Sequence, residues 1–199
     1  FSADDTIVAV ATPAGRGGIG VVRISGGDAR RVAMSLVQRR GPLEPRRATF
    51  TRLTLGGAAL AIGDEVVVTF FPAPHSYTGQ DVVEISAHGS PVVLEAIVRR
   101  AIETGARLAQ PGEFTLRGFL TGKRDLVRSE AVGDLIAAAT PLQARVTFDQ
   151  LEGTLTRRIG AIDSRLFDLI ARLEASLDFP DEGYHFIEPA DLDAELTGV

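Results

Sequence analysis

The chain has no cysteine and no tryptophan, and its 199 residues include one methionine and three histidines. The lack of cysteine excludes disulfides, thiolate catalysis and cysteine-ligated metals, and three scattered histidines do not form a metal-ligand pattern. A basic excess is also missing, because 21 Lys and Arg face 26 Asp and Glu, for a net charge of -5. The sequence therefore lacks the charge distribution of a stand-alone nucleic-acid binder.

Long apolar runs are missing as well. A membrane-spanning helix needs about 20 apolar residues, whereas the run near the N-terminus covers only residues 7–11 and follows two aspartates, unlike a signal peptide. We expect a cytoplasmic protein with no membrane partner. The chain begins with Phe1, and its last residues read as a helix that begins after Pro189. We expect it to be part of a longer protein.

The hydrophobic content of 45% is enough for a hydrophobic core. The pattern of apolar and turn residues changes near residue 111. Before it, short β-branched runs alternate with Gly and Pro turns. The expected strands are 6–11, 20–25, 48–55, 65–71 and 82–86, and the expected helices are 28–38 and 91–104. For the second helix, Ser90 suits the N-cap, Pro91 the first turn and Gly105 a left-handed end. This half is expected to mix strands with two helices.

After Pro111 the pattern is helical, with expected helices over 111–120, 127–139 and 141–179, the last beginning at Thr140 and Pro141. Leucine and isoleucine recur there every three or four residues from Leu151 to Leu177, which predicts one continuous apolar stripe. Two short helices cannot cover so long a stripe. We expect later helices or a partner subunit to cover it, and we assign the chain to the α+β class.

A Gly-rich segment, residues 15–20, fits the dinucleotide pattern G-x-G-x-x-G. A dinucleotide loop must open a helix, whereas residues 21–25 continue as a strand, so we expect a loop between two strands. The P-loop pattern G-x-x-x-x-G-K-[ST] is absent, because the one Gly-Lys pair, Gly122 and Lys123, is followed by Arg124. These residues do not bind GTP through a P-loop.

Two charged residues interrupt apolar strands. Arg23 alternates with Val22 and Ile24, and Glu84 lies in the similar run 82–86. Each alone is typical of a solvated strand face. If the two faces converge, a carboxylate that accepts two parallel hydrogen bonds and an arginine that holds a carboxylate suit a ligand with an aminopyrimidine edge and an acidic group.

Three other polar features have two interpretations each. Lys123 lies in a turn between helices and by itself reads as a surface lysine. His88 lies at a strand-to-helix turn, where it can line a site or cap the helix. Residues 178–182 place three carboxylates at a helix C-terminus, where acids are unfavourable, so they serve an interface or a solvated end.

A series of motifs occurs in a fixed order along the chain, at residues 5–9, 11–13, 15–26, 76–84, 88–89, 111–120, 123–126, 130–131, 134–136 and 178–182. In these motifs the sequence resembles the TrmE/MnmE family of tRNA-modification GTPases. The resemblance implies a tetrahydrofolate-binding-like, dimerising domain over residues 1–118 and the first part of a helical-bundle domain over 119–199, ending before a G domain. By motif alignment it implies folate contacts at Arg23, Glu84 and Lys123, and no catalytic residue in these 199.

The resemblance also implies cofactors and partners. The folate is 5-formyl- or 5,10-methylene-tetrahydrofolate, and it supplies the carbon for a group at carbon 5 of the wobble uridine of certain tRNAs. GTP, potassium and magnesium would act only through the G domain. A homodimer, the FAD protein MnmG (GidA) and tRNA held by the full complex are the implied partners.

Two other functions remain open. The chain could be a dimerisation and docking module that does not bind folate, and a folate titration separates these hypotheses. A stand-alone enzyme resembling aminomethyltransferases fits less well, because no general base lies near a second substrate site and the apolar stripe implies missing chain.

Overall fold

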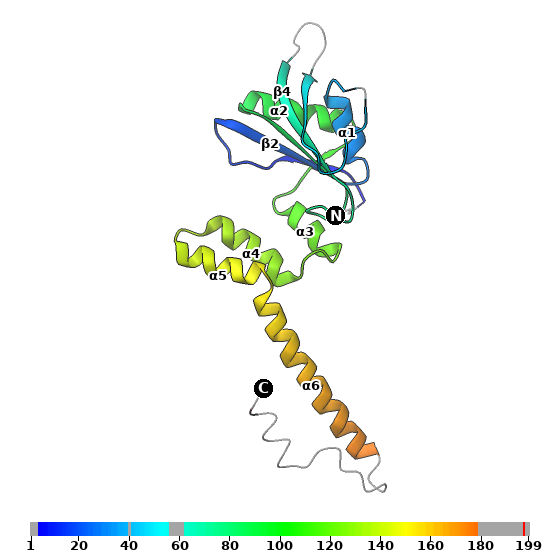
Figure 1. Cartoon of the computed structure of the whole chain (residues 1–199), viewed down its shortest axis with the longest axis vertical. Coiled ribbons are helices and arrows are strands. Elements are labelled where there is room, and N and C mark those ends of the chain that lie inside the picture. The colour runs from blue at the N-terminus through cyan, green and yellow to red at the C-terminus, as the bar shows by residue number, and fades with distance from the viewer. Residues whose placement is uncertain (1–3, 40, 56–61, 179–196, 198–199) are drawn as a thin grey trace. The chain divides into compact units, whose positions relative to one another are not determined.

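The computed structural model describes residues 4–39, 41–55, 62–178 and 197. The chain divides into two compact units, Phe1–Arg124 and Asp125–Val199. The boundary that the sequence suggested, after residue 118, lies inside helix α3 (Glu113–Leu120) of the first unit. The α+β class is confirmed, since the first unit holds a sheet with helices and the second holds helices (Figure 1).

The first unit is built on a six-stranded sheet with the order β3-β4-β5-β2-β1-β6. All neighbouring strands are antiparallel except β1 and β6, which are parallel. The strands are β1 (Ile7–Val10), β2 (Gly17–Ser25), β3 (Thr49–Leu55), β4 (Ile62–Phe71), β5 (Val82–Gly89) and β6 (Arg107–Leu108). The central strands β2 and β5 are far apart in sequence, and their pairing brings distant residues together.

Helices α1 (Ala29–Leu36) and α2 (Pro91–Glu103) supply the rest of the core. Val22 and Ile24 of β2 are 0% exposed and pack in this core with Val83 and Ile85 of β5. A Cβ on Gly20 would lie 2.5 Å from a methyl carbon of Leu94 on α2, so glycine permits the close approach of α2 to β2. The alternation predicted for β2 and β5 is confirmed, and Arg23 and Glu84 lie on the opposite face.

Most expected elements are present, with shifted ends. Helix α1 ends at Leu36, because Val37 is extended and bridges Leu53, so the expectation of a helix to residue 38 is wrong. Strand β6 was missed, because two residues carry no periodicity. Pro91 begins α2 and Gly105 has a φ of 108°, as predicted, whereas Ser90 makes no side-chain capping bond.

The face opposite α1 and α2 is partly covered by the segment 72–81, which connects β4 to β5. The hydroxyl oxygens of Thr78 and Ser25 on β2 are 2.7 Å apart, and both residues are fully buried. After α3, the Thr121 hydroxyl donates to the carbonyl of Thr78 at 2.7 Å. The segment is therefore fastened to both β2 and the turn after α3.

The second unit contains α4 (Leu126–Ala137), α5 (Pro141–Leu151) and α6 (Thr154–Asp178). Thr140 and Gln143 form a capping box, which confirms the predicted start of α5. The expectation of one continuous helix over 141–179 is wrong. Helix α5 ends at Leu151 and α6 begins at Thr154, and between them Gly153 has a left-handed φ of 78°. Of the three carboxylates expected at the end of this helix, only Asp178 lies within the described residues.

Candidate functional site

The sheet brings together two of the three residues that the motifs indicated. Arg23 on β2 is the direct cross-strand partner of Glu84 on β5. The Nε atom of Arg23 donates to Oε1 of Glu84 at 2.8 Å, and Nη2 lies 2.7 Å from the same oxygen. Their side chains are 22% and 28% exposed. The pair is thus half-buried and still open to a ligand.

Two aromatic rings flank this pair. The Cζ atom of Arg23 lies 4.6 Å from the ring centroid of Tyr77 and 5.6 Å from that of Phe114. Tyr77 belongs to the segment 72–81, and Phe114 lies on α3. Both residues are partly buried. Aromatic side chains with a few convergent polar groups are typical of sites that bind flat, polar-edged molecules.

Arg124 also contacts Tyr77. Its Cζ atom lies 4.2 Å from the Tyr77 ring centroid, and its Nη1 donates to the Tyr77 carbonyl at 2.9 Å. The hydroxyl of Tyr77 lies 3.0 Å from that of Thr115. Tyr77 is therefore held by its ring, its hydroxyl and its backbone.

Lys123, the third expected residue, is exposed in the turn after α3. Its backbone amide donates to Gly118 at 2.9 Å. Among the described residues its ammonium group has no hydrogen bond or ion pair with Arg23 or Glu84. The neighbouring Arg124, through Tyr77, is the residue that links this turn to the pair.

An ionic network that includes the buried Arg117 and Glu113 holds the segment 72–81 in place. Arg117 of α3 is 0% exposed and donates to the side-chain oxygen of Gln80 at 3.1 Å. It also binds the carboxylates of Asp5 and Glu113. Arg107 binds the same two carboxylates, each at 2.7 Å. Two arginines and two carboxylates thus tie the start of the chain, β6 and α3 together.

These contacts shift the ionisation of the carboxyl groups. Hydrogen bonds from Arg107 are the largest cause that lowers the pKa of Asp5 and the pKa of Glu113. The opposing effect of burial is weaker in both. The same carboxylates raise the pKa of Arg107. Asp5, Glu113 and Arg107 are therefore charged near neutral pH.

His88 forms a separate pair with Asp64 of β4. Its Nδ1 atom lies 2.6 Å from Oδ1 of Asp64, and its backbone amide donates to Oδ2 at 2.9 Å. Burial of Asp64 acts to raise the pKa of its carboxyl, but hydrogen bonds from His88 and Glu65 together lower it. Among the described residues, the His88 side chain forms no hydrogen bond or ion pair with Glu84, and the N-cap of α2 is Ser90.

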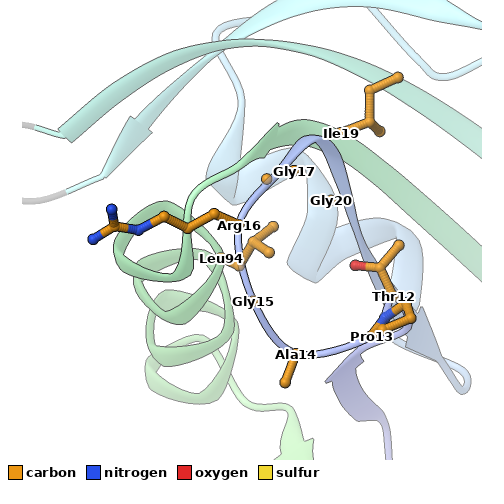
Figure 2. A pocket seen from close by; sticks show the side chains of 10 residues that line it. Thr12, Pro13, Ala14, Gly15, Arg16, Gly17, Ile19, Gly20 and Leu94 are labelled. Atoms are coloured by element: carbon orange, nitrogen blue, oxygen red, sulfur yellow. The ribbon is translucent and has the colours of Figure 1, made fainter.

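Residues 11–16 connect β1 to β2, so only Gly15 and Arg16 of the Gly-rich segment 15–20 lie in the expected loop, and residues 17–20 already belong to strand β2. A cavity of about 240 Å³ lies inside this connection, lined by residues 12–17, Ile19, Gly20, Gly89 and Leu94 (Figure 2). The side chain of Arg16 extends away from the loop. Ligand pockets usually exceed about 300 Å³. The cavity contains neither Arg23 nor Glu84 in its lining and is small for a dinucleotide.

Other site classes find no support in the described residues. Within the described ranges, no three His, Asp or Glu side chains lie close enough to hold a metal ion. None of the helices in those ranges is long and apolar enough to cross a membrane.

Sequence reasoning missed Tyr77 and Phe114 as neighbours of Arg23, and Arg124 as a contact of Tyr77. All three lie in or beside the motifs 76–84, 111–120 and 123–126 that carry the family resemblance. The signal was an aromatic residue inside each of the first two motifs, although nothing local indicates that both rings meet Arg23.

Comparisons with known proteins agree with the resemblance. A model of the family described as GTP-binding protein TrmE N-terminus matches residues 6–123, and one described as MnmE helical domain matches residues 126–199. The tRNA modification GTPase MnmE of Koribacter versatilis is 48% identical over 199 residues, covering 98% of this chain and 44% of the relative. That of Thiobacillus denitrificans is 47% identical over 196 residues, covering 98% and 43%. The chain spans less than half the length of these curated relatives.

Proposed function

The chain belongs to the TrmE/MnmE family, and on that premise we propose that its first unit binds a one-carbon tetrahydrofolate, such as the 5-formyl or 5,10-methylene form, at Arg23 and Glu84 with Lys123. The observation that carries the proposal is the pairing of Arg23 with Glu84. These residues are 61 positions apart in sequence, and they meet beside two aromatic rings. An ordinary surface ion pair would not need such surroundings.

The residues fit the chemistry of a reduced folate. The pterin ring presents a ring N–H beside an exocyclic amine, and a carboxylate accepts both in parallel. Glu84 uses only Oε1 for Arg23, and Oε2 accepts no hydrogen bond from the described residues. Arg23 and Lys123 are the cationic partners for the carbonyl or carboxylates of the ligand. The bound folate would supply the one-carbon unit, and these residues would bind and orient it.

The wider role follows from the family. We propose that these residues are part of a GTPase that, with the FAD-dependent protein MnmG (GidA), modifies carbon 5 of the wobble uridine of tRNA in the cytoplasm. The 199 residues contain no P-loop pattern. GTP, magnesium and potassium would therefore bind a G domain outside this sequence, and tRNA would be held by the full complex.

We further propose that the chain forms a two-fold homodimer through the strand-rich unit. Isologous dimers are the commonest assembly of soluble proteins. Analytical ultracentrifugation at micromolar concentration should give twice the chain mass of 21.1 kDa. A single species of the chain mass over this range would contradict the proposal.

A calorimetric titration with 5-formyltetrahydrofolate, without GTP, tests the binding proposal. Loss of a charged hydrogen bond costs about 1.5 to 3 kcal/mol, so Glu84→Gln should weaken binding by roughly ten- to hundredfold. Glu65→Gln is the matched control, because Glu65 also pairs with an arginine across two strands, Arg52, at 3.1 Å. A folded Glu84→Gln chain that binds like the parent would disprove the site. No binding by the parent chain, as a monomer or a dimer, would favour the docking-module hypothesis.

A further inference from the structure

The guanidinium of Arg23 makes the kinds of contact that a flat heteroaromatic ring would make at this place, with a carboxylate and with two aromatic rings. Its Nε and Nη2 atoms flank one carbon and point at the carboxylate of Glu84, at 2.8 and 2.7 Å. Its Cζ atom lies 4.6 Å from the ring centroid of Tyr77 and 5.6 Å from that of Phe114. An N–C–N edge on a carboxylate, next to aromatic walls, is also the arrangement that an aminopyrimidine would adopt.

The two groups compete for the same atom. Both donors of Arg23 use Oε1 of Glu84. A ring N–H and an exocyclic amine bind a carboxylate in parallel only if each takes its own oxygen, so they need Oε1 as well as Oε2. A ring that binds Glu84 in this way therefore displaces the guanidinium from Oε1.

We propose that Tyr77 and Phe114 are the ring-stacking walls of the folate site and that Arg23 is an internal competitor for it, a reading that rests on the proposed function. A ligand with only the ring must displace Arg23 from Glu84 and offers the guanidinium no new anion. A ligand that also carries carboxylates gives Arg23 a new partner, so its displacement costs less. Arg23 thereby makes the site select a complete folate over a bare pterin.

The walls do not depend on Arg23 for their position. The hydroxyl of Tyr77 lies 3.0 Å from that of Thr115, and its carbonyl accepts from Arg124 at 2.9 Å. Arg124 also remains over the Tyr77 ring at 4.2 Å. Phe114 is part of helix α3. Tyr77 and Phe114 can therefore keep their places while the guanidinium moves.

The test compares a pterin without glutamate and 5-formyltetrahydrofolate as ligands of the 199-residue chain. Arg23→Ala should bind the pterin about three- to tenfold more tightly than the parent chain, because it removes the competitor. The same variant should bind 5-formyltetrahydrofolate more weakly than the parent, by about threefold or more, because it loses a cationic partner. Arg30→Ala is the matched control, since Arg30 is an exposed arginine that also stacks on an aromatic ring, Phe70, at 5.5 Å. It should match the parent with both ligands.

The walls are tested separately. Tyr77→Leu should weaken both ligands by about fivefold or more, and Tyr77→Phe should lose less, because it keeps the ring. In ¹⁵N-edited NMR spectra, the Nε–H signal of Arg23 should shift on titration of the parent chain with 5-formyltetrahydrofolate. Circular dichroism checks that each variant is folded.

The outcomes separate the inference from the function on which it rests. If the parent chain binds 5-formyltetrahydrofolate but Arg23→Ala binds the pterin no more tightly, the competitor role is wrong and the proposed function stands. Equal affinity of Tyr77→Leu and the parent for both ligands would refute the stacking walls. If neither the parent nor Arg23→Ala binds either ligand, the folate function and this inference are both wrong.

Discussion

Arg117 and Glu113 form an ion pair one turn apart on α3, with Nη2 3.1 Å from Oε1 and side chains that are 0% and 1% exposed. Arg117 also donates to Gln80 at 3.1 Å and binds Asp5. Charged groups this far from water need several partners to offset the loss of hydration. Through Gln80, Arg117 is one of the residues that attach the segment carrying Tyr77 to the rest of the unit.

The replacement Arg117→Ala should therefore destabilise the first unit. Removing one partner of a buried ion pair costs about 3 to 5 kcal/mol, and we expect the lower end, because Arg107 still binds both carboxylates. Urea unfolding measures the change. Arg100→Ala is the control, since its exposed pair with Glu103 should contribute little. Equal stability losses in the two variants would show that the buried network is not stabilising.

The same network should make the fold sensitive to acid. The folded pKa values of Asp5 and Glu113 lie below their ordinary values of 3.8 and 4.5. Such groups stabilise the fold above the unfolded pKa, and the contribution is lost as the pH falls through the folded pKa. The free energy of unfolding should thus fall as the pH drops below about 4.5. Glu113→Gln should be less stable at pH 7 and show a shallower acid dependence, and an unchanged pH slope in that variant would contradict this.

The sequence predicted on which face of their strands Arg23 and Glu84 lie, but not that strands β2 and β5 are paired. Alternation in β2 and β5 placed Arg23 and Glu84 opposite the core, and both lie there. That the two strands are neighbours is a long-range property, which no local pattern contains. The role of Tyr77 was equally hidden, because the segment 72–81 folds over the sheet through partners on β2 and α3.

The break between α5 and α6 shows the same limit. Apolar residues continue at helical spacing across Gly153, so the periodicity predicted one helix. In the structure the carbonyl of Glu152 accepts from Arg128 of α4 at 3.2 Å, and Gly153 takes a left-handed conformation. The hydrogen-bond donor at the end of α5, Arg128, lies 24 residues before Glu152 in the chain. A glycine inside a helical pattern does not reveal such a partner.

Gly79 and Gly122 offer a matched test of how the Tyr77 segment is packed. Both have left-handed φ values, 78° and 70°. A Cβ on Gly79 would lie 2.5 Å from the Thr121 hydroxyl oxygen, whereas one on Gly122 would meet nothing within 4 Å. Alanine should cost about 1 to 2 kcal/mol at either position from the backbone alone. In urea unfolding, Gly79→Ala should lower the free energy of unfolding clearly more than Gly122→Ala does, and it should also weaken folate binding. Equal losses of stability in the two variants would mean that Thr121 moves aside freely.

The long helix α6 should be held less stably than the sheet. Five large apolar residues on it, Ile159, Ile162, Leu166, Phe167 and Ile170, are between 38% and 72% exposed, while Leu169 is 3% exposed. Because helices in proteins owe most of their stability to tertiary packing, a helix with this much exposed apolar surface should open often. Hydrogen exchange followed by mass spectrometry should show faster exchange of amides in the middle of α6 than in β5 (Val82–Gly89), whose Val83 and Ile85 are fully buried. Thr147 and Ala131 of the two preceding helices are buried, so α4 and α5 serve as internal references from the same unit. Exchange in α6 as slow as in β5 would mean that its apolar surface is covered in solution, and dilution would then tell whether a second copy of the chain covers it.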